Sequence, residues 1–321
     1  GGKTKMTKDM TRGTPWKLIV QFALPIMAGN LLQQLYNTAD TIIVGNFNGQ
    51  QALSAVGSCA SLTALFTALA IGFSIGAGVL ISQYFGASRE RELRQYAATA
   101  IVLMLAMGLF MSLAGVVSAR FLLERVLGTP EALLPMTLLY FRIYAAGLVF
   151  QFGYNIAAAL LRALGDSKSA LYFLMISSVL NIGGDLFFVE VLGWGSEGCA
   201  LSTVLSEALC CVLCVVYIQL KVPVLQLGRR WLVFDGSLLR STVRYGWTSA
   251  MQQATVQLGK IAVQAIVNTM GVNAMAAFTA ASRIDDFAYT PQQNIGHAMT
   301  TLMAQNRGAG KTDRVRQGYH C

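Results

Sequence analysis

Residues Leu24 to Gly45 read LPIMAGNLLQQLYNTADTIIVG, and they form the centre of an apolar stretch near 18–47. A transmembrane helix needs about 20 consecutive apolar residues, so this stretch is long enough to cross a bilayer. It nevertheless carries an acid, Asp40. A charged side chain at bilayer depth is costly unless it is paired or faces water. The sequence therefore predicts a membrane helix that holds a functional residue.

The composition of the whole chain is that of a membrane protein. Charged residues make up 12% of it, against about 25% in soluble domains, and the mean hydropathy is +0.53. Backbone groups in lipid must bond within their own segment, which favours helices, and the alternation of a membrane β-barrel is absent. We predict an all-α polytopic membrane protein with eight transmembrane helices, near 18–47, 52–85, 95–118, 132–163, 169–192, 198–222, 246–270 and 274–305.

The net charge of +9 is explained by topology. Nineteen of the 24 Lys and Arg residues fall in the N-terminus, in the alternate loops 86–94, 162–168 and 221–244, and after 305. Such a bias marks the cytoplasmic side of a membrane protein. We therefore expect a plasma-membrane (cell inner membrane) protein with a cytoplasmic N-terminus, and no nucleic-acid partner.

Cysteine and histidine give no sign of a metal or cofactor. Cys210, Cys211 and Cys214 lie in an apolar stretch without a nearby histidine, so packing explains them better than zinc. Cys59 and Cys199 both lie toward the outer ends of their stretches, and whether they pair is open, because spacing alone does not set connectivity.

The chain contains an internal repeat. Gly49, Ala52, Ala55, Gln83, Gly86, Ala87, Arg94 and Gln95 recur at an offset of 222, and Gln33-Gln34 recurs at an offset of 219. The first two helices are thus repeated as the seventh and eighth, six helices later, which makes the repeats parallel. We expect a six-helix bundle over 1–222, a cytoplasmic linker over 223–244, and the first two helices of a second bundle over 245–321. On this interpretation the chain is a C-terminally truncated piece of a twelve-helix protein.

Several polar residues share one depth in the membrane. Asp40 and Asp185 each lie seven residues before the outer end of their stretch, Tyr140 lies about eight residues into its own, and Thr203 five. A rise of about 1.5 Å per residue puts all four roughly 8–12 Å below the outer surface. Asn181 shares a helix face with Asp185 because the two are four residues apart.

These residues predict a polar cavity in the first bundle. Tyr140, Tyr144, Gln151 and Asn155 fall on one stripe, although Asn155 lies roughly 22 Å along the helix from Tyr140. Two neighbouring carboxylates in a low-dielectric site cannot both ionise cheaply, so a proton or a cation should sit between them. The alternative is a buried polar cluster that serves only helix association.

At these positions the chain resembles the multidrug and toxic compound extrusion (MATE) family, in its bacterial NorM-like and DinF-like form. The resemblance lies in Leu24–Gly45, with its Pro, Tyr and Asp in order, in NIGGD at 181–185, and in ALSTV at 200–204. It implies a drug/cation antiporter that has its coupling site in the first six helices.

The resemblance also implies roles for single residues. Asp40, Asn181, Asp185 and Thr203 would bind the coupling ion, H⁺ or Na⁺. Tyr36, Tyr140, Asn155 and Glu207 would form the surrounding network. Pro25 would bend the first helix.

Three further charges lie inside the second repeat. Lys260 matches Asp285 and Asp286 in depth, which favours an ion pair over the alternative of a substrate contact. Lys260 falls one residue beyond the repeat equivalent of Asp40, so the coupling ion is expected only in the first half.

The function that these features favour is secondary active export of amphipathic, cationic organic compounds in exchange for H⁺ or Na⁺. We expect a monomer that contacts membrane lipid and small organic cations, uses no cofactor and is not an enzyme. A flippase for lipid-linked saccharides is the first alternative, although its cavity should be more cationic. An integral-membrane prenyl-transferring enzyme that uses Asp285 and Asp286 to hold Mg²⁺ is the second, but a second Asp-rich motif is missing from the sequence.

Overall fold

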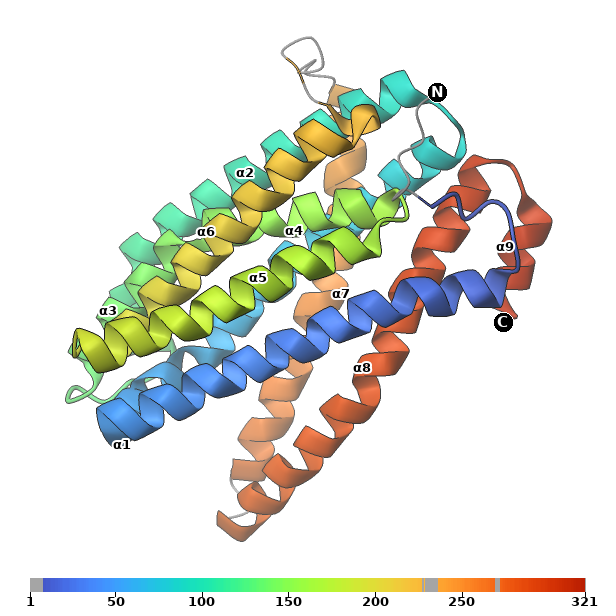
Figure 1. Ribbon diagram of the computed structural model, residues 1–321. Helices are drawn as coiled ribbons and strands as arrows, with labels where there is room; N and C mark the ends of the chain where they lie inside the picture. Colours follow the sequence, from blue (N-terminus) through green and yellow to red (C-terminus); the bar gives the residue numbers. More distant parts are fainter. Residues whose placement is uncertain (1–7, 227, 229–235, 269–271, 321) are drawn as a thin grey trace.

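The computed structural model describes residues 8–226, 228, 236–268 and 272–320, and this part of the chain is helical throughout, without a strand. Nine α-helices follow one another (Figure 1): α1 (Pro15–Gly86), α2 (Glu90–Phe121), α3 (Leu134–Ala146), α4 (Leu148–Ala163), α5 (Ser167–Asp185), α6 (Ser196–Lys221), α7 (Gly236–Asn268), α8 (Val272–Gly308) and α9 (Thr312–Tyr319). Two π-helical turns, η1 (Leu122–Val126) and η2 (Leu186–Val191), and a 3-10 turn, η3 (Pro223–Leu225), complete the described elements.

The all-helical membrane architecture predicted from sequence is confirmed. Five segments of the described chain are long and apolar enough to cross a membrane, or six if the bent pair α3 and α4 is one span. They are Pro15–Asn46, Leu62–Gly86, Glu90–Val126, Ser167–Val191, Ser196–Lys221 and the pair Leu134–Ala146 with Leu148–Ala163. Helices α7 and α8 occupy the last two predicted stretches with 33 and 37 residues, but they are not among these segments. The division into eight spans stays a prediction.

Helix α1 holds two spans and folds back on itself. It begins with Pro15 in its first turn, where a missing N–H costs nothing, and it runs for 72 residues. The backbone N–H of Met10, just before α1, donates to the Gln305 side-chain oxygen at 2.9 Å. At the other end of α1, a Cβ on Gly86 would lie 1.9 Å from the main-chain oxygen of the same Gln305. Both ends of α1 therefore meet α8, and Figure 1 shows the chain running out and returning.

The single helix predicted over 132–163 is broken, which corrects that expectation. Helices α3 and α4 meet at Gly147 with a bend of 41°. A Cβ on Gly147 would lie 2.4 Å from Val204 Cγ2 of α6, so α6 packs directly on the bare backbone at the bend. Glycine is permissive of such close approach, and its backbone ends α3.

Helix α7 packs on the returning half of α1 through small residues. Added Cβ atoms on Gly72 and Gly76 would lie 2.3 Å from Ala250 Cα and 2.5 Å from the Gly246 nitrogen, respectively. Backbones that approach this closely are typical of membrane helix pairs. The helix starts at Gly236, so part of the range predicted as linker is helical.

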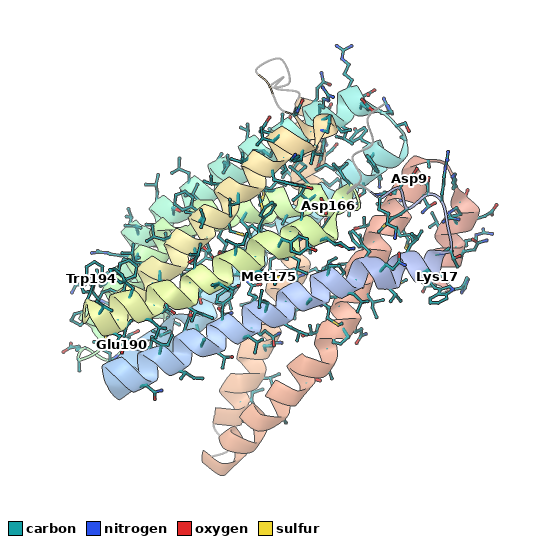
Figure 2. All side chains as sticks on the ribbon, viewed as in Figure 1. Asp9, Lys17, Asp166, Met175, Glu190 and Trp194 are labelled. Carbon is teal, nitrogen blue, oxygen red and sulfur yellow. The ribbon has the colours of Figure 1, made fainter. Side chains whose placement is uncertain are left out.

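The helices close tightly at one end of the molecule, which we call the closed end. There the N-terminal segment, the α4–α5 junction and the end of α8 meet. Figure 2 places Asp9 and Asp166 at this end, and Glu190 and Trp194 at the opposite end. Toward that opposite end α7 and α8 lean away from the α1–α6 bundle (Figure 1).

Residues that correspond in the repeat contact each other reciprocally at the closed end. A Cβ on Gly86 would meet the main-chain oxygen of Gln305 at 1.9 Å, and a Cβ on Gly308 would meet that of Gln83 at the same 1.9 Å. The pairs 83 with 305 and 86 with 308 are related by the offset of 222. Each repeat thus presents the same two residues to the other.

Candidate functional site

A cavity of about 640 Å³ lies between the α1–α6 bundle and the α7–α8 pair. Its volume is in the range of small-molecule binding sites. Most of the residues predicted as the site line it: Pro25, Tyr36, Asp40, Tyr140, Asn155, Thr203 and Glu207. They come from α1, α3, α4 and α6, so the tertiary fold gathers residues that are up to 182 positions apart in the sequence.

Two of the predicted coupling residues lie behind the cavity wall. Asp185 is fully buried, and Asn181 is 2% exposed. The carboxyl groups of Asp40 and Asp185 face each other closely enough to share a hydrogen bond when one of them is protonated. The Asn181 amide nitrogen lies 3.4 Å from Thr203 Oγ1, which lines the cavity. The structure therefore brings the four predicted coupling residues together around one point.

Buried oxygen atoms gather at this point, and the Ser202 hydroxyl and the Cys199 thiol are the neighbouring donors of Asp185. Among the described residues, Asp40 Oδ1, both carboxylate oxygens of Asp185 and Asn181 Oδ1 are buried and lack a hydrogen-bond partner. Ser202 adjoins Asp185 but directs its hydroxyl to the main-chain oxygen of Asn181 at 2.8 Å. Buried polar groups are rarely left unpaired, and carboxylate and amide oxygens suit a hard cation or a shared proton.

The backbone beside Asp185 is irregular. Helix α5 ends at Asp185, and the chain continues as the π-helical turn Leu186–Val191. A π-helical turn also ends α2, at Leu122–Val126, so this feature is not confined to the site. Nothing in the sequence indicated the turn beside Asp185.

A second polar group on the cavity wall centres on Gln151. Its Nε2 donates to Glu207 Oε1 at 3.3 Å and to Thr67 Oγ1 at 3.2 Å, and it lies 3.4 Å from the Tyr144 hydroxyl. The Asn155 side chain donates to the Gln151 main-chain oxygen at 2.8 Å. The predicted stripe from Tyr140 to Asn155 therefore lines one cavity even though the helix beneath it bends.

Tyr36 connects the two polar groups. It is 9% exposed, and its hydroxyl accepts a hydrogen bond from Gln33 Nε2 at 3.3 Å. Both Asp40 and Glu207 lie within electrostatic reach of that hydroxyl.

Some predicted features lie apart from the cavity. Lys260 and Asp285 are exposed and do not line it, and the side chain of Asp286 lies outside the described residues. Their pairing stays a prediction. Cys59 and Cys199 are both buried free thiols, so they do not form a bridge. The described residues hold no group of three or more His, Cys, Asp or Glu side chains that suits a metal ion.

Arg162 and His297 were not predicted as members of the site. Both line the cavity, as do the glutamines Gln253, Gln257 and Gln293 of α7 and α8. The predicted helix 132–163 and the predicted loop 162–168 overlap at Arg162, and the structure places this residue in the last turn of α4. The run NIAAALLRAL at 155–164, which no glycine interrupts before Gly165, could have indicated that the helix includes Arg162.

Comparison with known proteins agrees with this geometry. The family model described as MatE matches residues 25–187 and 249–320, which is more than half of the chain. The chain belongs to the MATE family of multidrug efflux transporters.

Two relatives of this MATE chain come from Bacillus subtilis. The probable multidrug resistance protein YpnP is 30% identical over 308 residues, which are 96% of this chain and 68% of the relative. The probable multidrug resistance protein YoeA is also 30% identical, with 97% of this chain and 69% of the relative covered.

Solved MATE structures share the fold. A MOP superfamily transporter from Pyrococcus furiosus superposes with a TM-score of 0.92 at 26% identity, covering 99% of this chain and 71% of that one. A structure described as the outward-facing conformation of a multidrug resistance MATE transporter gives the same TM-score, identity and coverage. As a member of this family with apolar spans, the chain is a plasma-membrane protein that interacts with lipid and small molecules.

Proposed function

We propose that this MATE chain exports amphipathic, cationic organic compounds in exchange for H⁺ or Na⁺ by alternating access. The observation that carries the proposal is the set of buried oxygens without a hydrogen-bond partner on Asp40, Asp185 and Asn181, directly behind the cavity wall. A carboxyl pair in such a place favours an added proton or a small cation. Asp40 lines the cavity, so an ion bound at its carboxylate would lie next to the space that the cargo occupies.

Coupling requires that the ion bind one conformation better than the other. Without the ion, two facing carboxylates repel each other and push α1 from α5; with it, they hold these helices together. Pro25, which lies inside α1 and lines the cavity, removes one helical hydrogen bond and is a natural bending point. The ion thereby sets the shape of the wall that the cargo meets.

The cavity suits a cargo with a positive charge and a flat apolar body. Glu207 lies on its wall and accepts a long hydrogen bond from Gln151 at 3.3 Å. Four tyrosines, Tyr36, Tyr140, Tyr144 and Tyr154, share that wall. Aromatic faces and a carboxylate together attract organic cations.

Alternating access needs an end that opens and closes. The contacts of Met10, Gln305 and Ala163 hold the closed end, whereas at the other end α7 and α8 lean away from the α1–α6 bundle. With a cytoplasmic N-terminus, this arrangement faces outward. We assign residues 1–222 to the ion-coupling lobe and 245–321 to a repeat-related second lobe, a division that the reciprocal Gly86 and Gly308 contacts support.

Transport by the full-length protein in proteoliposomes tests the proposal. A pH gradient and a Na⁺ gradient are imposed separately, and uptake of a cationic dye is followed for the wild type, Asp40→Asn and Asp185→Asn. We expect each variant to lose at least about tenfold of the gradient-driven rate, because a neutral amide removes the pair's charge.

The matched control is Glu190→Gln, an exposed acid at the far end of the bundle (Figure 2). Its gradient-driven rate should stay within about twofold of the wild-type rate. Full retention of coupled transport in both aspartate variants would refute the coupling site.

A further inference from the structure

One arginine of the cavity has no acid beside it. Arg162 lies in the last turn of α4 and lines the cavity. Among the described residues it takes part in no hydrogen bond and no ion pair. Side-chain nitrogens that are fully buried without a partner do not include those of Arg162. The guanidinium is therefore accessible from the cavity. A cation in a low-dielectric wall is costly unless an anion or water meets it.

The neighbours of Arg162 do not neutralise it. The groups within electrostatic reach are Tyr154, Cys214 and His297, none of which carries a carboxylate. The acid nearest in sequence, Asp166, is engaged elsewhere: it accepts the backbone N–H of Ser169 at 3.0 Å and the Tyr217 hydroxyl at 3.2 Å. His297 lines the same end of the cavity and supplies a second N–H donor there.

Arg162 and Glu207 lie at different levels of the same cavity. Glu207 is held at the level of Gln151, eleven residues before Arg162 on α4, or about 16 Å along the helix. The Arg162 side chain leans toward the N-terminal end of its helix, and hence toward Gln151, which shortens this gap. Arg162 adjoins the closed end, because the next residue, Ala163, accepts the Gln305 side chain at 2.8 Å.

We propose that Arg162, with His297 beside it, is an anion-binding subsite that holds a carboxylate of the cargo, so that the transporter accepts zwitterionic amphiphiles as well as simple cations. The cationic end of such a cargo would face Glu207 and its carboxylate would face Arg162. A guanidinium binds a carboxylate through two parallel charge-assisted hydrogen bonds. This inference rests on the proposed export function, and it extends the substrate class of the same cavity from cations to zwitterions.

A pair of dyes that differ in one group tests the subsite. Rhodamine 110 carries a free carboxylate, and rhodamine 123 is its methyl ester, so the ester lacks the anion but keeps the cationic ring system. Binding of each dye to the purified full-length protein in neutral detergent is measured by equilibrium dialysis. The variants are Arg162→Gln, Arg162→Lys, which keeps the positive charge, and Arg142→Gln, the same change at an exposed arginine of α3 that does not line the cavity.

We expect Arg162→Gln to weaken rhodamine 110 binding by about tenfold, or ~1.4 kcal/mol, and rhodamine 123 binding by less than about twofold. Arg162→Lys should recover part of the loss, and Arg142→Gln should change neither dye. Equal weakening of both dyes, unchanged rhodamine 110 binding, or a wild type that binds rhodamine 123 alone would overturn the anion subsite. Absence of rhodamine 123 binding in the wild type would contradict the proposed export function, and the subsite with it.

Discussion

Removal of the Gln305 side chain should loosen the closed end. Gln305 is completely buried, and its amide group joins two segments that are far apart in the chain. Its oxygen accepts the Met10 backbone N–H at 2.9 Å, and its nitrogen donates to the Ala163 main-chain oxygen at 2.8 Å. Gln305→Ala leaves both backbone groups without that partner while the end stays closed.

The size of the effect follows from these two bonds. A buried group that loses its partner costs about 1–3 kcal/mol. The Ala163 oxygen keeps a long contact from Ser82 at 3.4 Å, so the lower part of this range applies to that oxygen. When the closed end opens, water can form hydrogen bonds with the Met10 N–H and the Ala163 oxygen, so the cost of the lost partner applies only to the closed state. We therefore expect the ratio of closed to open molecules to fall by roughly 2 kcal/mol, or about 30-fold.

Distances between spin labels at the closed end report this ratio. Labels on Lys168→Cys of α5 and Arg307→Cys of α8 use two exposed positions on opposite sides of the closure. The background replaces Cys211, which is partly accessible, and Cys321 by serine. In Gln305→Ala the distance distribution should gain a longer component, measured in detergent and again in lipid.

Gln83→Ala is the matched control. Gln83 corresponds to Gln305 in the repeat, but its side chain forms no hydrogen bond with the described residues. Gln83 approaches Gly308 through its main-chain oxygen, which the substitution does not remove. This variant should keep the wild-type distance distribution. An unchanged distribution in Gln305→Ala, or an equal shift in both variants, would refute the reasoning.

Three further substitutions test the packing. Gly147→Ala should destabilise the protein by about 1–3 kcal/mol, because the new methyl group would lie 2.4 Å from Val204, and Val204→Ala in the same chain should recover part of the loss in thermal unfolding. Gly76→Ala should lower the unfolding temperature, because α7 backbone lies 2.5 Å from the new atom, whereas Gly183→Ala, with nothing within 4 Å, should be neutral or slightly stabilising; equal effects would contradict the close contact. Asp166→Ala should cost about 1–2 kcal/mol, because α5 loses its N-cap, while Asp166→Asn should keep most of that stability; a harmless alanine would argue against the cap.

Local sequence predicted the helical class and most of the coupling residues. Long apolar stretches admit only helices in lipid, and an acid within one of them is too costly to be incidental. Asp40 and Asp185 were found by that argument, and Asn181 and Thr203 by depth, helix face and the family resemblance; the structure brings the four together. The place of Asn155 on the cavity wall was harder to predict, because the distance from Tyr140 was measured along a straight helix and the helix bends at Gly147.

The sequence by itself therefore determined the all-helical membrane architecture, because that class depends on hydropathy summed over single segments. Only the tertiary structure decided how those segments bend and which side chains share a space. The break at Gly147 depends on Val204 of another helix, and the place of Arg162 depends on where α8 closes the cavity. Both are contacts between distant parts of the chain, and neither leaves a periodic signal in the residues that make it.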